Sequence, residues 1–249
     1  KHNYIVKDVN VLADVIREAF YIAREGRPGP VLVDICKDVT AAVAEYTPKI
    51  PKSIAVIGAD GIENNIDEIA EAINRSQKPI ILSGGGVSIA GACNEVLELS
   101  EKCSIPVATT LMGLGSFPGT HELFTGLVGM HGSRTSNMAV SETDLFIAIG
   151  ARFSDRVISD VSKFASKAKI VHIDIDEAEI GKNIDVDFSA VGNIKEILKL
   201  LISKVEKNER PEWRSKIAEW KSAYPLKYNK YYVLRPQYIV ERIYELTGG

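Results

Sequence analysis

The sequence predicts an α/β protein built on a doubly wound, Rossmann-like and mostly parallel six-stranded sheet with helices on both faces. Short apolar runs rich in β-branched residues alternate with stretches of helical period from residue 62 onward. This alternation of short apolar runs with helices is typical of a parallel sheet covered on both faces. Glycine-rich loops follow the strands, as expected where the loops of such a sheet bind a ligand.

The first 50 residues form a separate part of the prediction. Residues 11–23 have helical period, residues 24–30 break it, and residues 31–35 are typical of a buried strand. We expect these residues to form one helix–strand unit whose first half is missing. Residues 40–53 carry prolines and no sustained period, so they predict a linker with a domain boundary near residue 50.

The elements of the predicted sheet follow in order. We expect helices at 62–76, 87–103, 134–142 and 193–205, strands at 79–83, 106–110, 144–150 and 169–176, and an edge strand at 186–191. Residues 206–232 predict a surface helix and a crossing segment, and residues 236–249 an amphipathic helix. Trp213 and Trp220 lie seven residues apart, so we expect them to face the same way and to pack.

Composition narrows the classes of function. The 249 residues carry a net charge of -3 without long runs of one sign, which disfavours nucleic acid and anionic membranes as partners. No run of apolar residues is long enough to span a bilayer, and no secretory leader is recognisable. Three irregularly spaced cysteines predict reduced thiols and no metal site. We therefore expect a cytoplasmic or organelle-matrix protein that binds a small molecule or another protein.

Glycine-rich loops at consecutive strand ends predict a dinucleotide site, because backbone N–H groups there can face phosphates. The loops are Gly84–Gly86, Met112–Gly119, Gly126–Gly132 and Gly150–Arg156.

The fingerprint of NAD-dependent dehydrogenases is not satisfied. Gly84 and Gly86 fit it, but Ile89 stands in place of the third glycine. The second strand ends in threonines rather than in the acidic residue that holds the ribose. Asp174, at the end of a later strand, is the candidate for that role.

The segment from Leu111 to Ser133 is longer than an ordinary loop between a strand and a helix, which predicts a loop that is either disordered or functional. Its Met112, Phe117 and Met130 among glycines could surround a large, flat apolar ring.

Five segments in one order resemble a known family: GRPGPVLVDICKDV, TTLMGLGSFPG, GLVGMHG, IGARFSDRV and HIDIDEAEIGKN. They are similar to the large, catalytic subunit of acetolactate synthase (acetohydroxyacid synthase), a thiamine diphosphate enzyme that also binds FAD. The resemblance implies three regions: residues 1–50 from the end of the pyrimidine-binding domain, 51–206 as the central FAD-binding domain, and 207–249 leading into the diphosphate-binding domain.

The resemblance also implies site residues. The FAD contacts it implies are Arg27, Gly84, Gly85, Gly86, Thr110, Leu111, Val128, Gly129, Met130, His131, Gly150, Ala151, Arg152, Phe153, Ser154, Asp174, Ile175, Asn193 and Ile194. Lys37, Asp155 and Arg156 correspond to residues of the substrate channel. The family usually has proline at position 36 and aspartate at positions 154 and 193, where this chain has Cys36, Ser154 and Asn193.

The family's reaction condenses two pyruvates to 2-acetolactate, or pyruvate and 2-oxobutyrate to 2-aceto-2-hydroxybutyrate, with release of CO₂, in branched-chain amino acid biosynthesis. The glutamate that activates the thiamine and the Mg²⁺-diphosphate motif correspond to no residue of this chain. The resemblance therefore implies no catalytic and no metal-binding residue here, and a chain that is inactive alone. A homo-oligomer and a regulatory small subunit are the implied partners of the complete enzyme.

Other interpretations stay open at this stage. His131 and Met130 could be ordinary loop or core residues, His172 a packed histidine, and Asp155 with Arg156 a surface ion pair. The chain could belong to a related thiamine-dependent carboligase or decarboxylase. It could also be a scaffold or regulatory module whose flavin site has decayed, which an FAD titration would distinguish.

Overall fold

The computed structural model describes residues 1–53, 63–158, 160–229 and 233–248. Residues 54–62, at the start of the predicted central domain and including the first residue of the predicted helix 62–76, lie outside the described part. So do residues 230–232 of the predicted crossing segment and the terminal Gly249.

The six-stranded sheet confirms the predicted fold class. Its strands are β3 (Pro79–Ser83), β4 (Val107–Thr109), β5 (Phe124–Leu127), β6 (Leu145–Ile149), β7 (Lys169–Asp174) and β8 (Phe188–Val191). They lie in the order β5-β4-β3-β6-β7-β8, and every pairing is parallel. The direction of winding reverses between β3 and β6, and a sheet of this topology binds its ligand outside the carboxyl ends of its strands at that reversal.

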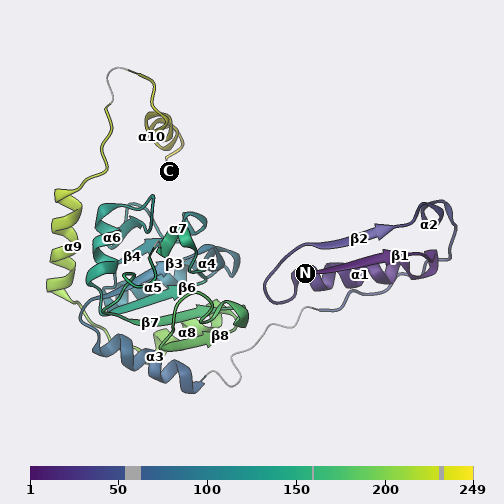
Figure 1. Cartoon of the computed structure of the whole chain (residues 1–249), viewed down its shortest axis with the longest axis horizontal. Helices are drawn as coiled ribbons and strands as arrows, with labels where there is room; N and C mark the ends of the chain where they lie inside the picture. The colour runs from purple at the N-terminus through teal and green to yellow at the C-terminus, as the bar shows by residue number, and fades with distance from the viewer. Residues whose placement is uncertain (54–62, 159, 230–232, 249) are drawn as a thin grey trace.

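Helices cover both faces of the sheet (Figure 1). Against one face lie α3 (Glu63–Arg75), α5 (Cys93–Cys103) and α8 (Ile194–Lys204), which pack on Ile81 and Ile147. Against the other lie α6 (Arg134–Glu142), α7 (Asp155–Ile158) and α9 (Pro211–Ala223), which pack on Ile80 and Phe146. Successive residues of β3 and β6 thus enter different cores, which explains why these strands are apolar throughout.

The prediction of one long loop between Leu111 and Ser133 is wrong, because this segment contains β5, the sixth strand of the sheet. A 3₁₀ turn, η1 (Leu111–Gly113), follows β4, and β5 then pairs with β4 at the edge of the sheet. β5 has only four residues, and Gly126 within it has a φ of +106°. A short strand that contains glycine and lies between glycine-rich turns has no recognisable period.

The predicted helix at 87–103 is also divided. α4 (Gly85–Ile89) begins directly after β3, and α5 starts only at Cys93. Gly91 between them has a φ of +62°, a conformation that ends an α-helix. The predicted helices at 134–142 and 193–205 and the edge strand at 186–191 are confirmed by α6, α8 and β8.

The N-terminal part contains one more strand than expected. β1 (His2–Val6) pairs in parallel with β2 (Val31–Ile35), and α1 (Val9–Arg24) connects them. The first half of this unit, expected to be missing, is therefore present. α2 (Lys37–Ala41) follows β2, and residues 42–53 have no regular structure, as a linker would.

The two tryptophans pack as expected. Trp213 and Trp220 of α9 are buried, and their rings lie edge to face with centroids 5.8 Å apart. The indole N–H of Trp213 donates to the carbonyl of Pro79 at 2.9 Å, which ties α9 to the start of β3. Beyond it, α10 (Pro236–Thr247) buries none of its residues. Among the helices of the described residues, we find none with the length and apolar character that crossing a membrane requires.

Candidate functional site: a cavity across the strand ends

A cavity of about 930 Å³ lies across the carboxyl ends of the strands, and all six strands of the sheet contribute to it. Its lining comes from the segments that follow β3, β4, β5, β6 and β8 and from the end of β7, together with the turn between α1 and β2. This is the position that a doubly wound sheet favours for a ligand, and the volume falls in the range of roughly 300–1,000 Å³ typical of ligand pockets.

Glycines make the floor of the cavity possible where β3 and β6 end. The N–H of Gly84 donates to the carbonyl of Ile149 at 2.9 Å, and the N–H of Gly86 donates to that of Gly150 at 3.0 Å. A Cβ on Gly86 would lie 2.7 Å from the Cα of Gly150. Only glycine allows the two loops to approach this closely.

The same bonds decide which amides can face a ligand. The N–H groups of Gly84 and Gly86 are engaged within the fold, whereas the N–H of Gly85 has no acceptor in the part of the chain that the structure describes. Gly85 lines the cavity at the beginning of α4. Of the three glycines, it is therefore the one with an amide available for a phosphate.

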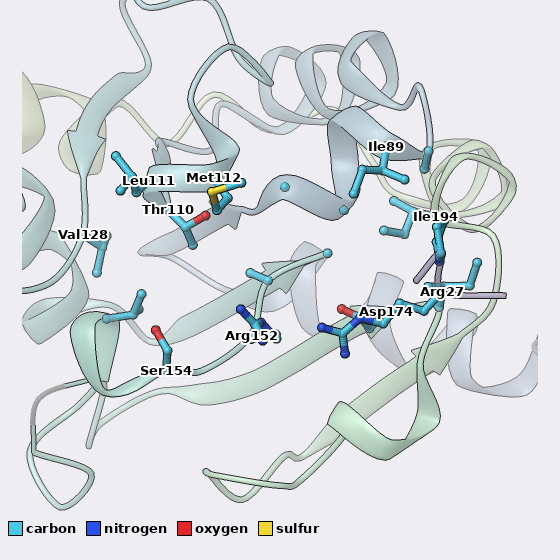
Figure 2. Close-up of a pocket in the computed structure, with 18 of the residues that line it drawn as sticks. Arg27, Ile89, Thr110, Leu111, Met112, Val128, Arg152, Ser154, Asp174 and Ile194 are labelled. Carbon is cyan, nitrogen blue, oxygen red and sulfur yellow. The ribbon is translucent and has the colours of Figure 1, made fainter. Parts of the chain in front are cut away.

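Arg152 occupies the middle of the cavity. Figure 2 shows its side chain between Leu111, Met112 and Val128 on one side and Asp174 on the other. Its guanidinium has no ion pair or hydrogen bond within the described residues. An exposed arginine that lines a concave site and has no anionic partner is suited to a phosphate or carboxylate of a ligand.

One end of the cavity is apolar. It is lined by Leu111, Met112, Leu127 and Val128 from the segments around β4 and β5. The hydroxyl of Thr110 accepts a hydrogen bond from the N–H of Gly113 at 3.1 Å and thereby fixes the turn that presents Leu111 and Met112. Both of these side chains are more than 70% exposed, so they offer apolar surface to a flat ring.

The other end carries a carboxylate. Asp174, at the end of β7, is buried, and its Oδ1 accepts a hydrogen bond from the N–H of Asp176 at 3.0 Å. Within the described residues its Oδ2 accepts no hydrogen bond. The nearest basic group, His172 Nε2, lies 4.0 Å from that oxygen, which is too far for one. A carboxylate in this position can accept hydrogen bonds from ribose hydroxyls.

His172 lies beneath this end as a packed histidine. Its ring is buried against Phe153, and its Nε2 donates to the carbonyl of Ala151 at 3.1 Å. Burial lowers the pKa of His172, although the nearby Asp174 acts in the opposite direction, so the imidazole is neutral at pH 7. The bond to Ala151 helps to hold the loop that carries Arg152.

Arg27 reaches the carboxylate end from the N-terminal unit. The turn that contains it, Gly26–Pro28, lines the cavity. Its Nη1 donates to Asp176 Oδ2 at 3.0 Å and to Glu179 Oε1 at 2.8 Å. Arg27 therefore differs from Arg152, because acidic residues of the protein already engage it.

Asn193 both lines the cavity and caps α8. Its Oδ1 accepts hydrogen bonds from the N–H groups of Lys195 and Glu196 at 3.0 and 3.4 Å. Asn193→Ala should lower the free energy of unfolding by about 1 kcal/mol, because the cap is lost. Asn193→Asp keeps the acceptor and adds a negative charge at the helix N-terminus, so we expect no loss of stability. Urea unfolding of both variants measures this, and an equal loss in the two would contradict the capping role.

The structure brings most of the predicted FAD contacts together. The cavity is lined by Arg27, Gly85, Gly86, Thr110, Leu111, Val128, His131, Gly150, Ala151, Arg152, Ser154, Asp174, Ile175, Asn193 and Ile194. Of the predicted channel residues, Arg156 also lines it.

The remaining predicted residues lie elsewhere, each for a recognisable reason. Gly84 is buried against Gly150 and Ala151, Gly129 packs against the backbone of Arg156, and Phe153 belongs to the core. Met130 is 62% exposed outside the lining. Lys37, in the first turn of α2, and Asp155, paired with Arg156 at 3.5 Å, are exposed and do not line the cavity.

Other lining residues were not among the predicted contacts. They are Gly26, Pro28, Ile89, Ala90, Met112, Leu127 and Val157. The sequence did indicate Met112, because its place among glycines suggested a residue that could contact a flat ring. Phe117, suggested for the same reason, is instead buried in the core. Ile89 takes the place of the third glycine of the dehydrogenase fingerprint, and here it is a largely exposed side chain at the edge of the cavity (Figure 2). No group of three or more His, Cys, Asp or Glu side chains in the described ranges is arranged to hold a metal ion.

The sheet order and the cavity at its reversal define a doubly wound α/β domain with a ligand-sized cavity at the switch point of its sheet. Comparison with known proteins narrows this class: residues 66–201 match the thiamine pyrophosphate enzyme central domain. The chain belongs to this family of thiamine pyrophosphate enzymes.

Curated relatives confirm the resemblance to acetolactate synthase large subunits. The chain is 45% identical over 231 residues to a probable acetolactate synthase large subunit of Methanocaldococcus jannaschii, which covers 89% of this chain and 39% of that protein. It is 36% identical to the large subunit from Buchnera aphidicola and 41% identical to chloroplastic acetolactate synthase 2 of Nicotiana tabacum. Those matches cover 100% of this chain and 45% and 39% of the relatives, so the chain spans less than half of their length.

Proposed function

We propose that the cavity binds FAD and that the chain forms the central, FAD-binding part of an acetolactate synthase large subunit. The observation that carries the proposal is the unpaired guanidinium of Arg152 in the middle of a cavity with two unlike ends. A flavin dinucleotide has the same distribution of chemistry: an aromatic ring system, a central diphosphate and an adenosine with ribose hydroxyls.

The lining residues indicate how FAD would lie. Arg152 and the amide of Gly85 would hold the diphosphate, because both are hydrogen-bond donors without another partner in the described residues. Leu111, Met112 and Val128 would contact the isoalloxazine, and Asp174 the ribose of the adenosine. A dehydrogenase-like NAD site is disfavoured, since β4 ends in Thr109 and no carboxylate follows it there.

Two of the three departures from the family pattern lie at the cavity. Ser154 and Asn193 both line the cavity, and each is polar without being charged. Relative to aspartate, each residue removes a negative charge from the lining of a cavity that we propose holds an anionic diphosphate. Asn193 also keeps the helix cap that an aspartate would provide.

In the complete enzyme the reaction would join two pyruvates to 2-acetolactate, or pyruvate and 2-oxobutyrate to 2-aceto-2-hydroxybutyrate, with loss of CO₂. Thiamine diphosphate, bound with Mg²⁺, supplies the carbanion chemistry of this reaction. The residues of this chain would position FAD and line the path of the substrate, with Arg156 at the cavity and Lys37 and Asp155 nearer the solvent. A homo-oligomer, a regulatory small subunit and a cytoplasmic location belong to the same proposal.

Titration of the purified chain with FAD, followed by flavin fluorescence, tests the proposal. We expect saturable binding with one FAD per chain. Arg152→Gln should weaken it about tenfold or more, because hydrogen bonds from a charged donor are worth roughly 1.5–3 kcal/mol. Arg75→Gln is the matched control, since Arg75 lies on α3 and pairs with Glu71 at the surface. Absence of saturable binding at high micromolar FAD, or equal affinities of the two variants, would contradict the proposal.

A further inference from the structure

The turn between α1 and β2 closes one end of the cavity. Gly26, Arg27 and Pro28 line that end, where Figure 2 shows Arg27 beside Asp174 and Ile194. The turn belongs to the N-terminal unit, and its partners Asp176 and Glu179 belong to the segment that follows β7.

Both carboxylates are oriented before they meet Arg27. Asp176 uses Oδ1 to accept a hydrogen bond from the N–H of Ala178 at 3.2 Å, which leaves Oδ2 for Arg27. The side chain of Glu179 is only 8% exposed, and Lys182 lies 3.1 Å from the oxygen that Arg27 contacts. The segment after β7 therefore presents a preformed anionic receptor to the arginine.

The charges of this cluster remain in place at neutral pH. Hydrogen bonds from Arg27 hold the pKa of Asp176 below its usual range. Burial alone would raise the pKa of Glu179, but hydrogen bonds from Arg27 and Lys182 outweigh it, and the pKa is lowered. Hydrogen bonds to the same two carboxylates raise the pKa of Arg27. Both Arg27 bonds start from Nη1, so Nε and Nη2 have no acceptor within the described residues.

We propose that Asp176 and Glu179 are positioning residues that hold Arg27 at the end of the cavity, so that the Gly26–Pro28 turn slows the escape of a bound dinucleotide. The inference rests on the proposed function, in which FAD occupies the cavity. Neither carboxylate contacts the ligand in this account, because each acts through Arg27. Loss of either should therefore raise the dissociation rate of FAD.

The dissociation rate of FAD, measured by flavin fluorescence after mixing the loaded chain with excess competitor apoprotein, tests this. Asp176→Asn or Glu179→Gln should release FAD about fivefold faster, as expected for loss of an ion pair worth roughly 1 kcal/mol. Lys182→Gln is the control, because it removes the other partner of Glu179 and leaves Arg27 paired; we expect less than a twofold change.

A double-mutant cycle separates positioning from a general structural role. In an Arg27→Gln background, adding Glu179→Gln should change the rate less than twofold, because the residue that it positions is already absent. The inference is overturned if the carboxylate variants release FAD at the unsubstituted rate, or if the effect of Glu179→Gln persists without Arg27.

Hydrogen exchange of the chain without FAD keeps this test separate from the proposed function. The amide of Gly29, which donates to the carbonyl of Ala23 at 2.9 Å, should exchange several-fold faster in Asp176→Asn and Glu179→Gln than in Lys182→Gln. Faster exchange in a chain that fails to bind FAD would support the role of the two carboxylates in holding the turn. It would overturn only the proposal that the cavity binds FAD. Unchanged exchange and release in a chain that binds FAD would overturn the role of the carboxylates and leave FAD binding intact.

Discussion

Gly84→Ala is expected to lower the free energy of unfolding by about 3 kcal/mol or more, the upper range for overpacking a core. A Cβ on Gly84 would lie 2.1 Å from the carbonyl oxygen of Gly150 and 2.6 Å from the Cα of Ala151. The neighbours are largely backbone, so they cannot move aside as a flexible side chain would. Gly84 has an extended backbone with φ -101°, open to any residue, and the cost therefore comes from contact alone.

Gly119→Ala is the matched control for this substitution. Its Cβ would have only a ring carbon of Phe124 nearby, at 4.0 Å, so we expect a change within about 0.5 kcal/mol. Urea unfolding can be followed by the fluorescence of Trp213 and Trp220, which both pack against the six-stranded part. A Gly84→Ala variant as stable as Gly119→Ala would show that β3 and β6 do not meet as closely as described.

Arg210→Met should lower the free energy of unfolding by about 3 kcal/mol, because it removes a buried cation that binds several carbonyls. Arg210 is 4% exposed at the start of α9. Its Nε donates to the carbonyl of Ser76 at 3.0 Å, and its two Nη atoms donate to the carbonyls of Ile73 and Cys103. These acceptors lie at the C-terminal ends of α3 and α5, where the helix dipole favours a positive charge.

Burial lowers the pKa of Arg210, with opposing effects from Cys103 and Asp144, but an arginine remains protonated in a folded protein. Its charge therefore persists, and methionine would leave the carbonyls without their donors. Arg214→Met, four residues further along α9, is the control, since Arg214 forms a partly exposed ion pair with Glu122 at 2.7 Å. That variant should lose less than about 1 kcal/mol. Equal losses in the two would refute the role of Arg210 in joining α9 to α3 and α5.

The main strands and helices were predictable because their patterns are local. β3 and β6 are nearly continuous apolar runs, and α8 has a clear helical period with Asn193 as its cap. β5 was not predictable, since its four residues become a strand only through pairing with β4. The break between α4 and α5 depends on Gly91, and a single glycine inside a helical pattern does not by itself predict an end.

The part of the site that was predictable consists of residues at or just after the carboxyl ends of the strands. Gly85 and Arg152 come within three residues after a strand and Asp174 ends one, so the topology brings them to one edge of the sheet. The partners of Arg27 were not predictable, because Glu179 is 152 residues away in the sequence. The resemblance to a family also could not distinguish Gly84 from Gly85, although one packs against backbone and the other faces the cavity.

The most direct measurement is a crystal structure of the chain grown with FAD. We expect the diphosphate to lie within hydrogen-bond distance of the Arg152 guanidinium and the Gly85 amide, with the isoalloxazine against Met112 and Val128 and the ribose at Asp174. A flavin bound elsewhere, or one bound in the cavity with its diphosphate away from Arg152, would contradict it.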